Sequence, residues 1–199
     1  MTHRGTSFDK DIVPVLLGWY WRGIFPMAEE TGEIFLYEPV KRGVIFLERF
    51  HVPDSLRKTV RSGKFEIRFN SDFEGVIHAC AERESTWISS ELIRWYTALH
   101  RAGYAHSVEA WRNDRLAGGL YGVSLGSIFC GESMFHRERD ASKVALVALV
   151  EHMKKKEMLL IDTQFTTEHL RRFGAEDIDQ EEYLRYVQKA KLYKEGFYP

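Results

Sequence analysis

Hydrophobic and polar residues follow two different patterns along this chain of 199 residues. In the first part, short apolar runs at Ile34–Tyr37 and at residues 44–47 are separated by proline and glycine, among many aromatic residues. Runs of this length between turn-forming residues are typical of strands joined by turns. We therefore predict a small strand-and-turn lobe over residues 1–52 and a larger domain over residues 53–199.

In the larger domain, helical and strand-like spacing alternate. Helical spacing places hydrophobic residues three or four apart, whereas strand-like spacing places them two apart. An antiparallel group of strands, then a helix and a further buried strand, predicts an α+β (α/β) fold, and this order leaves several architectures open. The predicted helices span residues 54–62, 72–82, 90–102, 141–156, 167–173 and 180–190, and the predicted strands span residues 65–69, 105–111, 116–123, 127–130 and 158–162.

Composition narrows the class of protein. The chain is 44% hydrophobic and 14% aromatic, which supports a buried core and argues against disorder. A net charge of -1 excludes a uniformly basic nucleic-acid coat but allows a local basic patch. No apolar segment reaches the ~20 residues that span a bilayer, and the polar first residues lack a signal-peptide pattern, so we expect a cytoplasmic protein.

The cysteines and histidines show no metal-binding pattern. Cys80 and Cys130 are far apart in apolar surroundings, which is typical of free buried thiols in a reducing compartment. The eight histidines include no pair at the spacing of a two-histidine helical site, and neither cysteine belongs to a Cys-x-x-Cys pair. We therefore expect no metal site.

Three segments in the second half of the chain carry a family resemblance. Residues 118–135 (GGLYGVSLGSIFCGESMF), 140–143 (DASK) and 161–164 (IDTQ) resemble the leucyl/phenylalanyl-tRNA–protein transferase family. The run FCGESMF is highly specific, because seven defined positions rarely recur by chance. The resemblance spans nearly the whole chain, with further matches at residues 20–26, 86–88 and 106–111.

The resemblance implies a GNAT-like acyltransferase domain with a small N-terminal lobe. It also implies transfer of leucine or phenylalanine, and less often methionine, from aminoacyl-tRNA to proteins that begin with Arg or Lys, which marks them for N-end-rule degradation. We expect a monomer. We also expect no cofactor, because the aminoacyl ester carries its own leaving group. One departure is Tyr37, which stands where many family members have tryptophan.

The reaction must remove a proton from the acceptor amine, whose free pKa of ~7.7–8.0 leaves it mostly protonated at neutral pH. Asp162 and Gln164 lie two residues apart at the end of a predicted strand, so their side chains should share a face. The resemblance implies that Gln164 contacts the amine while Asp162 polarises Gln164. Without the resemblance, Asp162 is more simply explained as the cap of the following helix.

Glu132 is a third candidate catalytic residue, in a turn expected after a strand. A carboxylate there can meet the positive N-terminus and first side chain of the acceptor, and the alternative is a solvated loop glutamate.

Five residues are candidates for binding the donor. Leu120, Phe129 and Met134 are candidates for an apolar pocket that holds the aminoacyl side chain, and the first two match pocket positions of the family. Trp87 and Tyr37 match the positions that stack on the terminal adenosine, where stacking is worth ~1–3 kcal/mol per base. Core packing is the stronger explanation for any one pocket residue taken alone, and buried core aromatics would look the same as stacking residues.

A basic segment follows the predicted N-terminal lobe. Arg57, Lys58 and Arg61 can share one helix face, and Lys64 follows closely. These residues are candidates for phosphate contacts with the tRNA acceptor stem, and a solvated helix surface explains them equally well.

Two other functions fit parts of the pattern. A GNAT-type acyl-CoA N-acyltransferase would share the fold, but residues 137–142 lack the glycine expected in a loop that binds the CoA pyrophosphate. A non-catalytic tRNA-binding module would keep the basic face and show no turnover.

Overall fold

The computed structural model describes residues 8–29, 31–82 and 86–197. Its elements, in chain order, are α1 (Phe8–Tyr20), β1 (Phe25–Ala28), β2 (Ile34–Tyr37), β3 (Lys41–Phe46), the short 3-10 helix η1 (Leu47–Arg49), α2 (Asp54–Arg61), β4 (Glu66–Phe69), α3 (Phe73–Ala81), α4 (Ser90–Arg101), β5 (Ala105–Arg112), β6 (Arg115–Leu125), β7 (Ile128–His136), α5 (Ala141–Lys155), β8 (Leu160–Gln164), α6 (Glu168–Arg171), β9 (Glu176–Asp179) and α7 (Gln180–Ala190).

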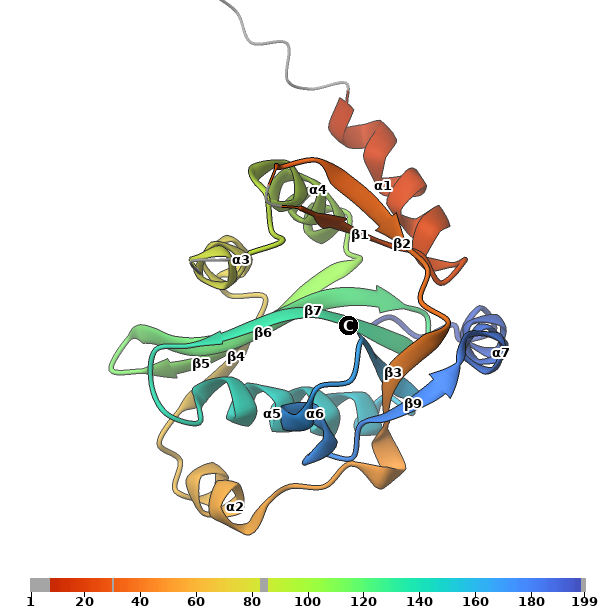
Figure 1. The fold of residues 1–199 in the computed structure, drawn as a ribbon. Coiled ribbons are helices and arrows are strands. Elements are labelled where there is room, and N and C mark those ends of the chain that lie inside the picture. Colours follow the sequence, from red (N-terminus) through yellow and green to blue (C-terminus); the bar gives the residue numbers. More distant parts are fainter. Residues whose placement is uncertain (1–7, 30, 83–85, 198–199) are drawn as a thin grey trace, which may run out of the picture.

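A seven-stranded mixed sheet in the order β4-β5-β6-β7-β8-β3-β9 forms the centre of the fold (Figure 1). Among the described strands, β7 and β8 form the one parallel pair, and α5 is the crossover between them. Their pairing extends only from Ile128 and Leu160 to Cys130 and Asp162. Beyond these residues the two strands no longer pair, and the sheet opens between them.

Helices cover both faces of the sheet. Figure 1 shows α1, α3 and α4 on one face, and α5, α6 and α2 on the other. Leu16, Ile77 and Leu92 belong to the core on the first face, whereas Leu56 and Val144 belong to the core on the second face. None of the helices in the described ranges combines the length and the apolar character that a membrane-spanning helix requires.

The mixed α+β class is confirmed, and most of the helices begin at the residues that the sequence predicts. The side chain of Asp72 accepts a hydrogen bond from the amide of Gly75 at the start of α3. The side chain of Ser89 does the same for Leu92 at the start of α4. These caps satisfy amide groups that have no partner inside the helix.

Two elements differ from the prediction for the first part of the chain and for its end. Where strands and turns alone were predicted, α1 forms, because Ile12, Leu16 and Tyr20 recur every four residues and bury one helical stripe. Pro14 lies inside α1 and is exposed, and it obscured this spacing. Near the end of the chain, β9 forms a short edge strand that the pattern did not predict.

A third difference concerns Glu132. The strand predicted to end at residue 130 continues to His136 as β7, so Glu132 lies in a strand and not in a turn. The prediction was wrong because glycine and polar residues interrupt the apolar alternation there.

The chain before the predicted boundary at residue 52 contributes strands to two different sheets. α1, β1 and β2 form a small layer on one side of the main sheet, where α1 packs against α4, and β1 and β2 pair as a two-stranded sheet. β3, however, lies inside the main sheet between β8 and β9. The chain before residue 53 therefore contributes both to the small layer and to the sheet that carries the site.

Candidate active site

A cavity of about 280 Å³ lies where β7 and β8 diverge. One part of its lining is apolar and comes from β6, β7, α5 and β8. Another part carries Trp87 and the polar side chains of Glu132 and Gln164. The cavity therefore joins an apolar interior to a small polar group. The apolar lining includes Leu120, Met134, Leu146, Leu149 and Ile161.

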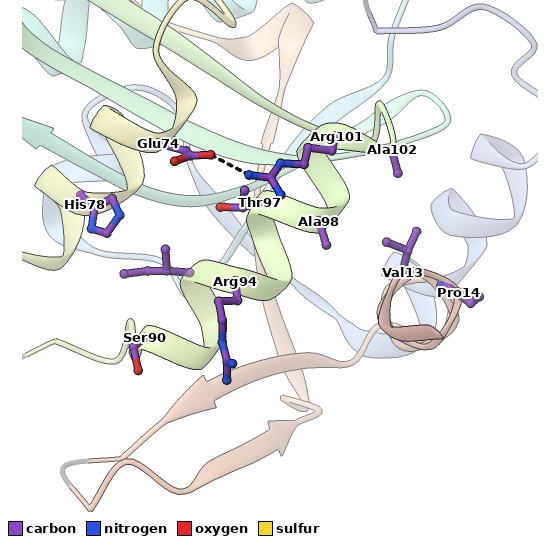
Figure 2. A pocket seen from close by; sticks show the side chains of 11 residues that line it. Val13, Pro14, Glu74, His78, Ser90, Arg94, Thr97, Ala98, Arg101 and Ala102 are labelled. Atoms are coloured by element: carbon purple, nitrogen blue, oxygen red, sulfur yellow. Dashed lines mark hydrogen bonds and ion pairs between the residues drawn. The ribbon is translucent and has the colours of Figure 1, made fainter. Parts of the chain in front are cut away.

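A larger hollow, of about 1040 Å³, opens elsewhere, between α1, α3 and α4 (Figure 2). Arg101 donates to Glu74 across it, at 3.1 Å, and Arg94 also lines it. This hollow shares no lining residue with the cavity at β7 and β8. We place the candidate site in the smaller cavity, because there an apolar interior meets the side chains of Glu132 and Gln164.

A β-bulge turns Glu132 toward the helices. Tyr121 pairs with Ser133 and Gly122 pairs with Gly131, so Glu132 has no partner on β6. A side chain at Gly122 would collide with the backbone carbonyl of Cys130 and with a ring carbon of Phe129. Bulges re-aim side chains and recur beside functional sites. Gly122 therefore allows the backbone distortion that places the Glu132 carboxyl at the cavity.

The Glu132 carboxyl is surrounded by neutral hydrogen-bond donors. The hydroxyl groups of Tyr20 and Tyr96 donate to its two oxygens at 2.7 and 2.9 Å, and lie 2.8 Å from each other. The side-chain amide of Gln164 donates to Oε1 at 3.1 Å. Burial raises the pKa of Glu132 to about 7, although the two tyrosine hydroxyls act in the opposite direction. This carboxyl can therefore gain or lose a proton near neutral pH.

The Asp162 carboxylate has a charged partner and is fully buried. Arg42 donates to both of its oxygens, at 2.8 and 2.7 Å. The Tyr183 hydroxyl adds a third bond at 2.7 Å, and the backbone amide of Gln164 a fourth at 2.9 Å. Each oxygen of Asp162 thus accepts two hydrogen bonds from inside the protein. The described contacts include none between its carboxylate and the side chain of Gln164.

Arg42 is held on all sides. Its guanidinium lies between the rings of Phe25 and Tyr183, 4.7 and 4.6 Å from their centres, and it also donates to the carbonyl of Gly23 at 2.8 Å. Burial disfavours its charge, but the Asp162 carboxylate outweighs that effect, and the net result is a raised pKa for Arg42. Arg42 and Asp162 form a closed ionic unit beneath the site.

Gln164 ends β8 in a left-handed conformation, with φ of 57°. Such a conformation costs a non-glycine residue on the order of 1–3 kcal/mol, and it persists where surrounding contacts hold it. Asp162 supplies such a contact through the Gln164 amide, while the Gln164 side chain reaches Glu132. The alternative role of Asp162 as a helix cap is wrong, because Thr167 caps α6 with its own hydroxyl.

The remaining donor candidates separate into two groups. Leu120, Met134 and Trp87 line the cavity with Glu132 and Gln164. Phe129, by contrast, is fully buried against Phe197, with ring centres 5.1 Å apart, and does not line the cavity. Tyr37 stacks on Phe25 and is likewise outside the lining.

The basic residues lie on or just after α2. Arg57, Lys58 and Arg61 are exposed, and Arg57 donates to the carbonyl of Val52 and lies 3.6 Å from Asp54. Lys64 pairs with Glu138, at 3.1 Å, in the segment before α5. This group therefore lies away from the apolar interior and beside the start of α5.

Four residues that touch the candidate carboxylates were not predicted: Tyr20, Tyr96, Arg42 and Tyr183. Tyr20 lies at the edge of a matched motif, and Tyr96 lies on the apolar face of its helix, so both read as core residues. Arg42 carries no signal of burial in the sequence, because its partner is 120 residues away.

An apolar cavity that ends at a titratable carboxyl and a side-chain amide fits an enzyme that binds an apolar group and moves a proton beside it. Comparison with known proteins agrees. Residues 44–188 match the family model described as leucyl/phenylalanyl-tRNA protein transferase. A curated relative from Maricaulis maris (strain MCS10), named leucyl/phenylalanyl-tRNA–protein transferase, is 50% identical over 188 residues, which cover 92% of this chain and 87% of the relative.

The chain therefore belongs to the leucyl/phenylalanyl-tRNA–protein transferase family and is a transferase. The family resemblance predicted from the motifs is confirmed.

Proposed function

We propose that this protein transfers leucine or phenylalanine, and less often methionine, from aminoacyl-tRNA to proteins that begin with Arg or Lys, and so marks them for N-end-rule degradation. The observation that carries the proposal is the cavity at β7 and β8, which joins an apolar interior to Glu132 and Gln164. The parallel pair that opens on one side supports a GNAT-like domain. The proposal includes a cytoplasmic monomer that needs no cofactor.

The donor side chain occupies the apolar end of the cavity, against Leu120 and Met134. A pocket of this kind discriminates by only ~1–3 kcal/mol per methylene, so several apolar amino acids fit. The terminal adenosine stacks on Trp87, with Tyr37 and Phe25 as an aromatic pair on the neighbouring small sheet. Arg57, Lys58, Arg61 and Lys64 contact phosphates of the acceptor stem.

Glu132 takes the proton from the acceptor amine. Its pKa of about 7 lies close to the amine's free pKa of ~7.7–8.0, so the transfer is nearly balanced at neutral pH. The amine nitrogen then attacks the ester carbonyl and forms the new C–N bond. The ester C–O bond breaks, and a second proton from the nitrogen goes to the departing ribose oxygen.

The number of hydrogens available for hydrogen bonding supports a protonated Glu132 at one stage of the reaction. Three contacts join Glu132, Tyr20 and Tyr96, and the two hydroxyls supply only two hydrogens. A protonated Glu132 supplies the third hydrogen and completes the ring. The carboxyl can therefore accept a proton without losing a contact.

Gln164 orients the amine, and Asp162 is a positioning residue. Glutamine has no usable pKa, so Gln164 acts by hydrogen bonding. Asp162 holds the strained backbone of Gln164 through the amide, and Arg42 fixes Asp162 in turn. Asp162 thus acts on Gln164 by holding its backbone and not by polarising its side chain.

The test is a transfer assay with radiolabelled Leu-, Phe- and Met-tRNA and with peptides that begin with Arg, Lys, Asp or Glu. Labelled product is expected from Leu-tRNA and Phe-tRNA with the Arg and Lys peptides. Binding of aminoacyl-tRNA without any transfer would indicate a tRNA-binding module instead. Calorimetric binding of acetyl-CoA, together with no transfer from tRNA, would indicate an acyl-CoA N-acyltransferase.

A further inference from the structure

A second hollow adjoins the active-site cavity at the start of α5. It has a volume of about 650 Å³ and shares Met134 and His169 with the cavity, so the two are continuous along one rim. Its other lining residues come mainly from the segment that joins β7 to α5. We call this hollow the α5 cleft.

The α5 cleft carries an excess of positive charge. Arg137, Arg139 and Lys143 line it with Asp140, and Arg137 is paired outside the lining with Glu82, at 3.1 Å. Asp140 lies 2.9 Å from Lys143 and 3.9 Å from Arg139, and the Arg139 side chain is 89% exposed. Two cations thus share one anion, and Arg139 is available to a ligand.

The positive charge of the cleft affects the pKa of His169, which lies on the rim shared by the cleft and the cavity. Burial lowers its pKa, and so do the nearby positive groups of Lys143, Arg172 and His136. Positive groups around a histidine disfavour its protonation, because the imidazolium would be repelled. The cleft is therefore electropositive at the point where it meets the cavity.

The backbone adds to this effect. Asp140 precedes α5 in a left-handed conformation, with φ of 71°, and its side chain makes no capping hydrogen bond to the helix. The first turn of a helix presents amide groups and the positive end of the helix dipole, and phosphate groups bind there readily. Ser142, in this first turn, lines the cleft beside Lys143.

We propose that the α5 cleft binds the phosphate backbone of the single-stranded 3′ end of the donor tRNA, an inference that rests on the proposed function. With the amino acid in the cavity, the terminal ribose lies at the rim, and the nearest phosphates lie within one nucleotide of it. The acceptor is a poor occupant, because its ammonium and its Arg or Lys side chain are repelled by the same charges.

The position of α2 extends this path. Thr59 donates to Asp140 at 3.3 Å, and Lys64 pairs with Glu138, so α2 lies directly against the segment that forms the cleft. Lys58 and Arg61 are exposed on this same helix, which adjoins the α5 cleft. The single-stranded 3′ end of the tRNA, after leaving the cavity through the α5 cleft, would then reach α2, whose basic residues we propose bind the acceptor stem.

The test compares two double variants that each remove one arginine and one lysine. Arg139→Gln/Lys143→Gln removes cleft charges, and Arg185→Gln/Lys194→Gln removes exposed charges elsewhere. Both cleft cations lie near Asp140, and in the control pair Arg185 lies near Glu181. Thermal melting checks that both variants fold.

The cleft variant should raise the KM for leucyl-tRNA about tenfold at physiological salt, with kcat unchanged. Its tRNA binding should also depend less on salt, with the slope of log K against log salt reduced by about 0.7 for each lost single-strand contact. The control variant should keep the KM and the slope of the wild type. Equal behaviour of the two variants would overturn the proposal.

Leucyl-adenosine, which has no phosphate, serves as a second donor. The cleft variant should use it as well as the wild type does. A similar loss with both donors, or a raised KM for the Arg peptide, would overturn the proposal, because the residues would then act on the cavity or on the acceptor. Failure of the proposed function looks different: the wild type itself would transfer from neither donor. Arg139→Gln alone, at a largely exposed side chain, keeps the test valid if the double variant is unstable, with an expected slope change of about 0.7.

Discussion

Glu132 and Asp162 lie on neighbouring strands of one sheet, and their surroundings differ in the charge of their partners. The Asp162 carboxylate is buried and paired with Arg42. The Glu132 carboxyl lies beside an open cavity and accepts hydrogen bonds from two tyrosine hydroxyls and a side-chain amide. Burial raises the pKa of Glu132 to about 7, so both forms of this carboxyl are accessible near neutral pH. The comparison assigns proton transfer to Glu132 and structural support to Asp162.

The largest expected effect comes from Glu132→Gln. The variant keeps the size of the side chain and loses the group that takes the proton, so turnover should fall about 10²–10⁴-fold. Single-turnover rates with leucyl-tRNA and an Arg peptide measure the loss, and equilibrium tRNA binding serves as the control. Turnover close to that of the wild type would break the comparison.

Asp162→Asn should act mainly on stability. The change leaves the buried Arg42 without its counter-charge, and breaking such a pair costs about 3–5 kcal/mol of unfolding free energy. Denaturant unfolding measures this loss. The double variant Arg42→Met/Asp162→Asn should recover most of the stability, because no unpaired charge remains. If Asp162→Asn unfolded like the wild type yet lost as much turnover as Glu132→Gln, Asp162 would be the proton acceptor after all.

The pH dependence of stability should also separate the two acids. The pKa of Glu132 is about 7 in the folded protein, above its ordinary value of 4.5, so the folded state holds the proton more tightly than the unfolded state does. Stability should therefore fall as pH rises from about 4.5 to about 7, by up to about 3 kcal/mol, and level off above. Glu132→Gln should remove this component. Melting curves of both proteins at pH 5 and pH 8 test it, and an equal change in both would exclude it.

The smallest effect is expected from Tyr96→Phe. The Tyr96 hydroxyl lowers the pKa of Glu132 by donating to it, so its removal should raise that pKa further. The midpoint of the pH–rate profile should move upward, and the rate at pH 7 should fall a few-fold. Leu99→Ala, in the core on the same helix, is a control that destabilises the fold without moving the midpoint. A downward shift in Tyr96→Phe would contradict the proposed role of the tyrosine pair.

Helix caps and periodicity made much of the fold predictable. Asp72 and Ser89 cap their helices through local contacts, which a sequence displays directly. The continuation of β7 past residue 130 was not predictable, because a bulge depends on the partner strand. β9 was missed because Ile178 is the one apolar residue among the three acidic residues of this short strand, so no apolar alternation can be seen.

The site residues that belong to the family motifs could be predicted from the sequence. The residues that contact them in the folded protein could not. The resemblance pointed to Glu132, Asp162 and Gln164. It did not indicate that Asp162 pairs with Arg42, since only the folding of the chain brings these residues together. It also could not separate Leu120 from Phe129, because both are apolar strand residues, and only the arrangement in space leaves one at the cavity and the other in the core.

The chain before residue 44, which includes α1, β1, β2 and the start of β3, has a practical consequence for the design of shorter fragments of this protein. The family match begins at residue 44, and a fragment cut there would still contain the complete signature motif. It would lack Tyr20 and Arg42, however, so Glu132 would lose one donor and Asp162 its counter-ion. Such a fragment would still match the family motif, but it would lack a donor to the titratable Glu132 and the ionic partner that holds Asp162 in place.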